Sequence, residues 1–261
     1  TALCEIARPE FGIITNIGKA HLEGFGSIDG IKKAKSELYQ FIAKINGKLF
    51  VNNEDNLLLD LAANINKTTY GKDGDYIGTI SSETPFISLQ FREHLIDSNL
   101  IGDYQFYNIM LAIAIGSAFG IADVNIKQAI ENYTPKNNRS QIVNTRRNRL
   151  ILDAYNANPA SMRAMLTAFA KQDYNNKLCI LGDMLELGEN SEKEHKTIVE
   201  LTKELSLEAV FVGKEFSKVN SETYKSTSAL ADKLKLDTIE KKTILLKGSR
   251  GIALEKLVDL L

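Results

Sequence analysis

The second half of the chain alternates segments with strand and helix character, and this rhythm limits the folds open to it. Four largely apolar segments have strand character: 149–155, 177–183, 208–213 and 242–248. The helical segments that separate and follow them are 159–172, 191–205, a short helix around Leu230, and 253–261. Because such helices connect successive strands by right-handed crossovers, we expect a mostly parallel sheet covered on both faces. Residues 141–261 are therefore predicted to form one α/β domain.

The first half mixes its elements. Residues 11–17 and 48–53 have the character of buried strands, and 27–45 form an amphipathic helix with a stop at Gly47. Residues 86–92 alternate apolar and polar side chains as a half-buried strand does. A strongly apolar helix over 104–120 follows, and Asp123 is expected to cap the next helix. We expect a mixed sheet with helices over residues 1–140, and a boundary within the polar stretch 139–144.

Composition excludes several classes of protein. The 261 residues carry 32 Lys and Arg against 33 Asp and Glu, so no charge excess favours nucleic acid or an anionic membrane as a partner. No apolar run reaches the roughly 18 residues of a membrane span, and no signal-peptide pattern is present. Cys4 and Cys179 lie far apart in apolar stretches, which favours reduced core thiols over a disulfide. These features predict a cytoplasmic protein, and we expect a monomer.

Three loops that follow predicted strands carry polar residues where ligands bind in open α/β sheets. In "LDAYNANPAS", Asp153 suits a ribose hydroxyl pair, and Asn158 can cap a helix whose free N–H groups suit an anion. The alternative for this loop is an Asx-turn that leads into a well-capped helix. In "LGDMLELGENS", Asp183 and Glu186 are either site carboxylates or residues of a turn and helix start.

The third loop, "LLKGSRG", places Lys247 and Arg250 on either side of small residues. Two cations at a strand end could hold a carboxylate or a phosphate, and a solvated turn is the alternative. In the first half, His21 is a ligand, a catalytic base or an ordinary loop histidine. By pattern alone, Lys35 is part of a solvated helix face. Asn108 lies in an apolar helix, where a buried amide needs a partner such as a planar heterocycle or a neighbouring helix.

Several long segments, in this order, carry a family resemblance: "ARPEFGIITNIGKAHLEGFGS", "KAKSELY", "GDYQFYN", "LDAYNANPASM", "LGDMLELG" and "LLKGSRG". Together they resemble the Mur ligases of peptidoglycan synthesis. The resemblance implies the latter part of the central ATPase domain over residues 1–140 and a Rossmann-like C-terminal domain over 141–261. The motifs "DAYNANPASM", "GDMLELG" and "KGSRG" are similar to those of the member whose substrates are UDP-muramoyl-tripeptide and D-alanyl-D-alanine.

The resemblance also implies a reaction and its cofactors, ATP and Mg²⁺. Such a ligase phosphorylates a substrate carboxyl with ATP, and the amine of D-Ala-D-Ala then attacks the acyl phosphate. His21 matches a histidine that binds the second Mg²⁺, and Lys35 matches a lysine that is often carbamylated and supports the same ion. An unmodified lysine would repel Mg²⁺, whereas its carbamate offers hard oxygen ligands. We therefore expect Lys35 to be carbamylated.

Other positions match the nucleotide and substrate motifs of the family. Asn108 matches the residue that contacts adenine, Arg139 an arginine near the phosphates, and Asp153 the carboxylate that binds the ribose of ATP. A further group falls in motifs that face the cleft, where the dipeptide and the acyl phosphate should meet: Tyr155, Asn156, Asn158, Lys247 and Arg250. Of these, Tyr155 is assigned to the cofactor and the rest to substrate.

The sequence departs from the family in two respects. Gln105 stands where the family often has Asn or His, and no G-x-x-x-x-G-K-[ST] stretch occurs to cradle the phosphates. The chain also begins inside an apolar segment, and we expect it to lack ligase activity on its own. Two other hypotheses stay open: a ligase of the same superfamily that adds another amino acid, and a non-catalytic interaction module that kept the scaffold.

Overall fold

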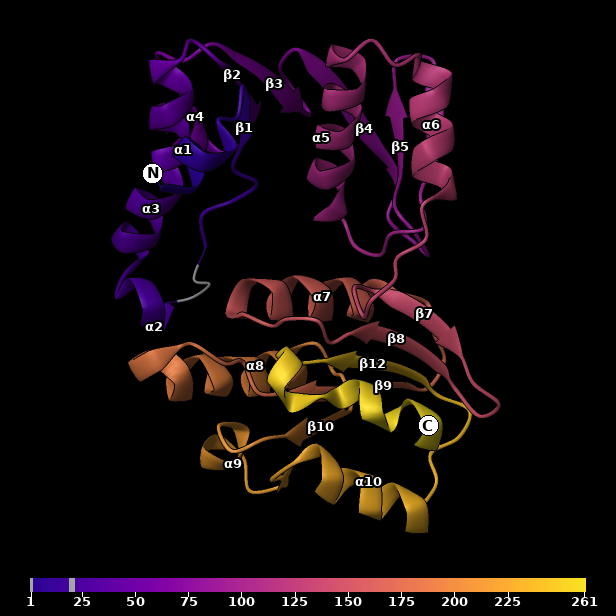
Figure 1. Ribbon diagram of the computed structural model, residues 1–261. Helices are drawn as coiled ribbons and strands as arrows, with labels where there is room; N and C mark the ends of the chain where they lie inside the picture. The colour runs from indigo at the N-terminus through magenta and orange to yellow at the C-terminus, as the bar shows by residue number, and fades with distance from the viewer. Residues whose placement is uncertain (1, 19–21) are drawn as a thin grey trace. The chain divides into compact units, whose positions relative to one another are not determined.

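The computed structural model describes residues 2–18 and 22–261, which fold into two compact units. The first unit comprises residues 2–18, 25–99 and 103–133, and the second is made mainly of residues 134–261. Each unit has its own sheet and its own helices (Figure 1). The units are therefore described separately.

The first unit is built on a six-stranded mixed sheet with the order β1-β2-β3-β4-β5-β6. Its strands are β1 (Phe11–Ile13), β2 (Lys48–Asn52), β3 (Lys67–Gly71), β4 (Tyr76–Ser82), β5 (Ser88–Phe91) and β6 (His94–Asp97). The helices before residue 134 are α1 (Ala2–Ala7), α2 (Leu22–Phe25), α3 (Ile28–Lys44), α4 (Asn56–Leu61), α5 (Gln105–Ala118) and α6 (Asp123–Asn132). β1 to β4 pair in parallel, and β4, β5 and β6 pair antiparallel, as expected of a mixed sheet.

The amphipathic helix predicted over 27–45 is confirmed as α3. Ser27 caps its N-terminus by accepting a hydrogen bond from the backbone N–H of Gly30 at 3.0 Å. Its apolar stripe buries Ile31, Tyr39 and Ile42, and the last two join a core cluster with residues of β2.

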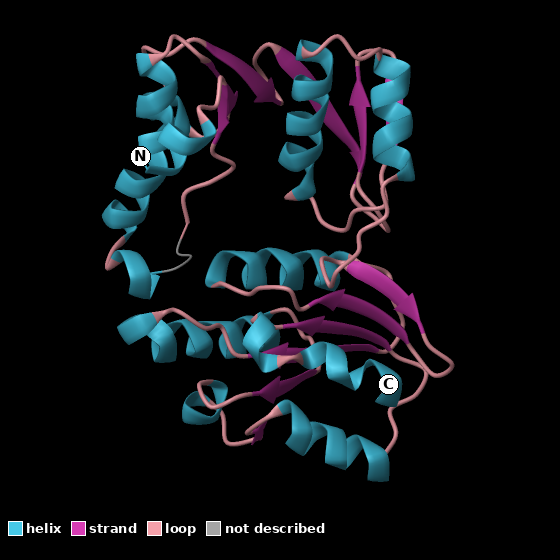
Figure 2. Ribbon diagram, viewed as in Figure 1, coloured by secondary structure: helices cyan, strands magenta, loops and turns pink. Residues whose placement is uncertain are grey.

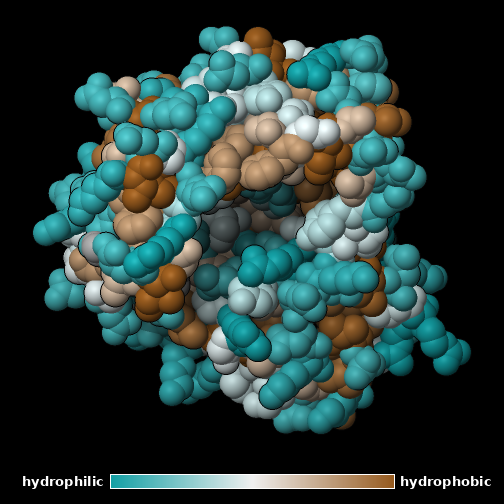
Figure 3. Space-filling view, turned by 45° about the horizontal axis from the view of Figure 1, so that its top comes forward, coloured by the Kyte–Doolittle hydropathy of each residue, from teal (hydrophilic) through white to brown (hydrophobic). Residues whose placement is uncertain are grey.

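On the face of the molecule shown in Figure 3, hydrophilic residues predominate, and apolar residues occur in small groups.

The second unit is built on a six-stranded sheet with the order β11-β10-β9-β12-β8-β7. Its strands are β7 (Gln141–Asn144), β8 (Arg149–Asp153), β9 (Lys177–Gly182), β10 (Ala209–Val212), β11 (Thr223–Tyr224) and β12 (Thr243–Lys247). The helices are α7 (Pro159–Lys171), α8 (Ser191–Glu204), α9 (Phe216–Val219) and α10 (Thr227–Leu236), with 3₁₀ helices η1 (Gly188–Asn190), η2 (Arg250–Ile252) and η3 (Leu254–Leu260). All neighbouring strands are parallel except β7 and β8, which confirms the predicted mostly parallel sheet.

Successive side chains of the central strands point to opposite faces of this sheet, and both faces are covered (Figure 1). On one face, Leu150, Ile180 and Leu246 join a buried cluster with residues of α10 and η3. Ile151 and Leu245 alternate with that set and are fully buried as well. This two-sided burial explains why the central strands are nearly continuous apolar runs.

Three local expectations need correction. Asp123 is the first residue of α6 rather than its N-cap, and its carboxylate pairs with Arg92 at 2.7 Å instead of capping the helix. The predicted final helix is a 3₁₀ helix, η3. Both cysteines are free, as expected, but only Cys179 is a core residue, whereas Cys4 is partly exposed.

None of the helices in the described residues is both long and apolar enough to span a bilayer.

Candidate active site

The loops that follow β8, β9 and β12 meet at the carboxyl edge of the second sheet (Figure 2). They meet because β12 inserts between β9 and β8, although it is the last strand in the chain. The polar residues after these strands, which are far apart in sequence, therefore surround one edge. This is the convergence that the strand and helix rhythm predicts.

The loop after β12 is held against the loop after β9 by small residues. A Cβ on Gly248 would lie 2.9 Å from the Cα of Gly182, so the two strand ends approach this closely only because residue 248 is glycine. The Ser249 N–H donates to the carbonyl of Asp183 at 3.0 Å, and the Leu185 N–H donates to the Ser249 hydroxyl at 2.9 Å. These bonds fix the direction in which Arg250 leaves the loop.

Asp153 and Lys247 form the innermost charged pair of this edge. They are paired in register on β8 and β12, and the Lys247 ammonium, whose residue is 2% exposed, donates to Asp153 Oδ2. The other carboxylate oxygen, Oδ1, accepts from the backbone N–H of Ser140 at 3.0 Å and from its hydroxyl at 3.2 Å. Each oxygen of Asp153 thus already has a partner within the second unit.

Two of the other predicted site residues, Arg139 and Arg250, lie beside Tyr155. The guanidinium carbon of Arg139 lies 3.8 Å from the centroid of the Tyr155 ring, and that of Arg250 lies 5.7 Å from it. All three residues are exposed and line a cavity of about 450 Å³. The full lining is Asn137, Asn138, Arg139, Ala154, Tyr155, Arg250 and Glu255. The ring holds two cations at one opening, which suits an anionic group.

Asn158 is the N-cap of α7, as the sequence predicts. Its side chain accepts from the Ser161 N–H at 2.9 Å, and the Ser161 hydroxyl accepts from the Asn158 N–H at 3.1 Å, a capping box. Pro159 follows at the first helical position. Asn156 is exposed, and its side-chain oxygen accepts from the Ala157 N–H at 2.9 Å. Both asparagines thus also shape the turn that leads into α7.

For Asp183 the structure favours the turn and helix-start interpretation over a site carboxylate. The residue is 3% exposed, and its two oxygens accept from the N–H groups of Glu215 and Phe216, each at 2.9 Å. This places the carboxylate at the start of α9, where a negative charge stabilises a helix. Glu186, the other acidic residue of that loop, has a backbone φ of 63°, which lies in the left-handed region.

A buried histidine that sequence reasoning missed lies behind this turn. The Met184 N–H donates to Nε2 of His195 at 3.0 Å, so Nε2 is an acceptor, and Nδ1 lies 2.7 Å from the Ser191 carbonyl. Burial lowers the pKa of His195 below its ordinary value of 6.5, despite the Asp183 carboxylate at 3.7 Å. His195 is therefore neutral at pH 7 and supports the loop that carries Met184.

The second residue missed at sequence level is Glu255, in the first turn of η3. It lines the cavity with Tyr155 and the two arginines, and its Oε2 is buried without a hydrogen-bond partner among the described residues. The sequence signal for Glu255 is weak because the residue sits in an ordinary amphipathic segment, "ALEKLVDLL". Only the fold brings this segment back to the cavity.

In the first unit, the side chain of Lys35 turns inward from α3. Its ammonium donates to the backbone carbonyl of Asn16 at 2.7 Å, and partial burial lowers its pKa. Lys33, on the same helix, is exposed, so the solvated-face interpretation applies to it and not to Lys35. His21 lies outside the described residues.

Asn108 differs from its expected setting. The residue is exposed rather than buried, and its amide nitrogen donates to Gln105 Oε1 at 2.8 Å, one turn earlier on α5. The partner is therefore on its own helix rather than on a neighbouring one. An exposed side-chain amide remains accessible to the edge of a heterocycle.

Of the two residues expected to hold Mg²⁺, the structure describes only Lys35, and Lys35 suits the ion only in part. The Lys35 ammonium, as it stands, is a cation that donates to a carbonyl and cannot be a ligand. As a carbamate, the same side chain would offer oxygen atoms, which Mg²⁺ prefers. The fit of this position to the ion thus depends on the modification.

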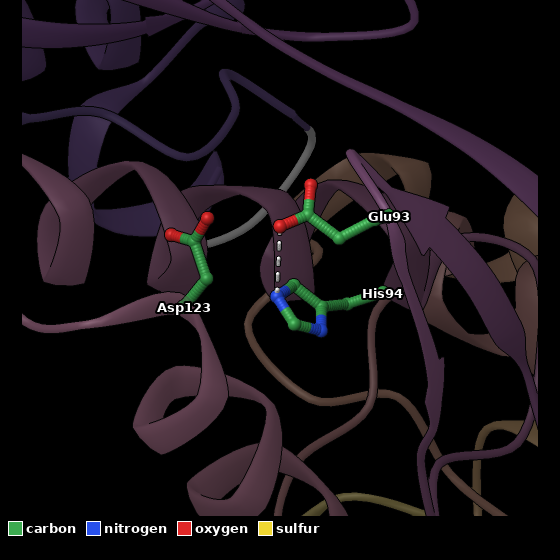
Figure 4. A group of neighbouring side chains, drawn as sticks. All are labelled: Glu93, His94 and Asp123. Carbon is green, nitrogen blue, oxygen red and sulfur yellow. Dashed lines mark ion pairs between the residues drawn. The ribbon is translucent and has the colours of Figure 1, made fainter.

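Another group of possible ligands lies where the β5–β6 hairpin meets the start of α6 (Figure 4). It consists of Glu93, His94 and Asp123, and His94 Nε2 lies 3.6 Å from Glu93 Oε1. Arg92 Nη1 lies 2.7 Å from Asp123 Oδ2 and neutralises that carboxylate. The arrangement therefore ties the hairpin to α6 by an ion pair.

The chain matches known families along most of its length. Residues 1–116 match the Mur ligase middle domain, and residues 138–250 match the Mur ligase glutamate ligase domain. The chain belongs to the Mur ligase family.

Individual relatives are more specific. The UDP-N-acetylmuramoyl-tripeptide--D-alanyl-D-alanine ligase of Bacillus subtilis is 30% identical over 98% of this chain and 60% of its own length. The crystal structure of MurF from Acinetobacter baumannii matches with a TM-score of 0.83 and 28% identity, over 98% of this chain and 60% of that one. MurF of Thermotoga maritima in complex with ADP has the same fold, with a TM-score of 0.81, 22% identity, and coverage of 99% of this chain and 62% of that one. The chain thus spans about 60% of the length of the relatives it matches.

Proposed function

We propose that the protein is an ATP-dependent ligase that joins D-alanyl-D-alanine to UDP-N-acetylmuramoyl-tripeptide in the cytoplasm. Residues 1–140 contribute the latter part of its ATP-binding domain, and residues 141–261 form its C-terminal ligase domain. The observation that carries this proposal is the cavity in which Arg139 and Arg250 flank Tyr155 beside the Asp153–Lys247 pair. The similarity to D-Ala-D-Ala ligases supports the choice of substrates.

The chemistry of such a ligase requires cations more than acids or bases. A carboxylate oxygen of the tripeptide attacks the γ-phosphorus of ATP, ADP leaves, and an acyl phosphate forms. The amine of the dipeptide then attacks the carbonyl carbon, and phosphate leaves with the former carboxylate oxygen. Both steps gather negative charge, which fixed guanidinium groups stabilise. Arg139, on the Tyr155 ring, is the group that we assign to the transferred phosphate.

The nucleotide contacts follow from the same assignment. Asn108 contacts adenine with its exposed amide, Tyr155 contributes its ring, and Asp153 binds the ribose. The lone pairs that Asp153 leaves after bonding Ser140 and Lys247 are the ones available to ribose hydroxyls. We assign the substrate contacts at the carboxyl edge of the second sheet to Asn156, Asn158, Lys247 and Arg250.

Mg²⁺ is the second cofactor that we propose, and it would neutralise phosphate charge when bound. His21 and the carbamate of Lys35 would hold it. The hydrogen bond from the Lys35 ammonium to the Asn16 carbonyl supports this role, because it holds the side chain in a partly buried position.

The test is ligation by the full-length protein. It is incubated with ATP, Mg²⁺, UDP-muramoyl-tripeptide and either D-Ala-D-Ala or single amino acids, and the products are identified by mass spectrometry. The proposal requires ADP, phosphate and the pentapeptide product with the dipeptide, and loss of turnover in His21→Ala. Ligation of single amino acids alone would favour another ligase of the superfamily. Absence of turnover with every acceptor would favour a non-catalytic module.

A further inference from the structure

The cavity around Tyr155 contains one carboxylate among its charged groups. Ala253 has a φ of 57°, which turns the chain so that η3 starts at Leu254. Leu254 and Leu257 are fully buried and fix this helix against the sheet. Glu255 is therefore held in the cavity wall by the packing of its neighbours.

The Oε2 atom of Glu255 is buried, and within residues 2–18 and 22–261 it has no hydrogen-bond partner. A buried carboxylate oxygen without a donor costs free energy, and this cost is removed when a ligand supplies an N–H or O–H group. The other side chains of the lining are the two guanidiniums, the Tyr155 ring, two amides and an alanine. The wall thus combines two fixed cations with a single anion that lacks a donor.

Such a wall matches a ligand that carries both signs of charge. With Arg139 assigned to the transferred phosphate, Arg250 and Glu255 remain for a molecule with one carboxylate and one ammonium. A dipeptide is such a zwitterion, and its two residues span roughly 7 Å when extended. The cavity of about 450 Å³ has room for it.

We propose that Glu255 is a specificity-determining residue that binds the α-ammonium group of the incoming dipeptide, while Arg250 binds its carboxylate. This inference rests on the proposed function and adds to it the residue that distinguishes a free amine from a blocked one. Phosphate groups are the poorer match for the part of the wall formed by Arg250 and Glu255, because they would meet a carboxylate of the same sign. The contact with Glu255 holds the amine that becomes the nucleophile.

The first experiment needs no variant. Dissociation constants of D-Ala-D-Ala and N-acetyl-D-Ala-D-Ala, which lacks the ammonium, are measured by NMR titration of the full-length protein. We expect the free dipeptide to bind at least about tenfold more tightly, because a charged hydrogen bond is lost on acetylation. Equal affinities would overturn the inference.

The second experiment compares variants of the full-length protein. Glu255→Gln should raise the KM for D-Ala-D-Ala about tenfold and leave the KM for ATP within about twofold. It should also abolish the preference for the free amine in the binding measurement. Glu255→Asp should recover part of the affinity, and Glu222→Gln, at an exposed position of the same unit, should change neither KM.

Outcomes for the inference and for the proposed function are separable. If the unaltered protein ligates D-Ala-D-Ala but Glu255→Gln changes only the KM for ATP, or neither KM, the inference fails and the function stands. If the unaltered protein does not ligate D-Ala-D-Ala at all, the proposed function fails. Circular dichroism of each variant confirms that the fold is kept in the comparison.

Discussion

Lys247 and Asp153 lie side by side on adjacent strands, and their side chains form an ion pair at the carboxyl edge of the second sheet. The lysine side chain is 2% exposed and the aspartate side chain 18%, so the pair is largely removed from water. Ser140, just before β7, donates to the same carboxylate. The pair thus joins β12, β8 and the segment that enters the unit.

Removal of one partner of this pair should destabilise the second unit. Lys247→Met leaves the carboxylate of Asp153 without its cation, and we expect a loss of about 3 kcal/mol in the free energy of unfolding. The measurement is guanidinium unfolding followed by circular dichroism. Lys225→Met, at an exposed position, serves as the matched control and should change little. An unchanged midpoint for Lys247→Met would show that the pair contributes nothing to stability.

Replacement of the Tyr155 ring should weaken the positioning of the arginine side chains beside it and so weaken the binding of ATP. Tyr155→Ala removes the surface on which Arg139 lies at 3.8 Å, and the KM for ATP should rise about fivefold to tenfold, the equivalent of about 1 kcal/mol. Tyr155→Phe keeps the ring and should behave as the unaltered protein does. Steady-state kinetics of the full-length protein distinguish the two. Equal KM values in both variants would mean that the stacking has no role in binding.

The stability of the second unit should depend on pH through His195. Burial holds its folded pKa below the ordinary 6.5, so below that pH the unfolded chain binds the extra proton. The free energy of unfolding therefore shows no loss from His195 well above pH 6.5. It falls as the pH drops below 6.5, by at most about 1.4 kcal/mol per pH unit for one proton. Protonation would also cost the bond from the Met184 N–H to Nε2.

Two variants separate His195 from other titrating groups. His195→Gln can accept from Met184 and donate to Ser191 without titrating, and the fall in stability between pH 7 and pH 5 should become shallower. His94→Gln removes a histidine of β6, in the first unit, and serves as the control variant. Denaturant midpoints across this pH range provide the comparison. The same slope in all three proteins would exclude His195 as the source.

The modification of Lys35 can be observed directly. With ¹³C-bicarbonate at neutral pH, the full-length protein loaded with Mg²⁺ should give a carbamate carbon resonance that is lost in Lys35→Met. Lys33→Met, on the exposed face of the same helix, should retain it. Native mass spectrometry that finds Lys35 unmodified in the active, metal-loaded enzyme would refute the expected carbamate.

Local chemistry made part of the site predictable. The cap at Asn158 and the proline after it act within a few residues, so the pattern "NPAS" is sufficient to place them. The convergence of loops after β8, β9 and β12 follows from the parallel alternation of strands and helices. Both inferences depend on short-range order in the sequence.

The remaining features depend on contacts between distant segments. The pairing of Asp153 with Lys247 requires β12 to insert beside β8, which the order of strands along the chain does not reveal. Asn108 was expected to be buried because α5 is apolar nearly throughout, so its sequence does not mark which side faces solvent. The carboxylate of Asp123 bonds to Arg92, a residue of the β5–β6 turn, and therefore does not cap α6.

The central claim, amide formation through an acyl phosphate, is tested most directly by isotope transfer. UDP-muramoyl-tripeptide is labelled with ¹⁸O in its terminal carboxylate and incubated with ATP, D-Ala-D-Ala and the full-length protein. Our account predicts that each phosphate released carries one ¹⁸O atom, because the carboxylate oxygen that attacked ATP leaves with the phosphoryl group. Release of unlabelled phosphate alongside the pentapeptide product would contradict it.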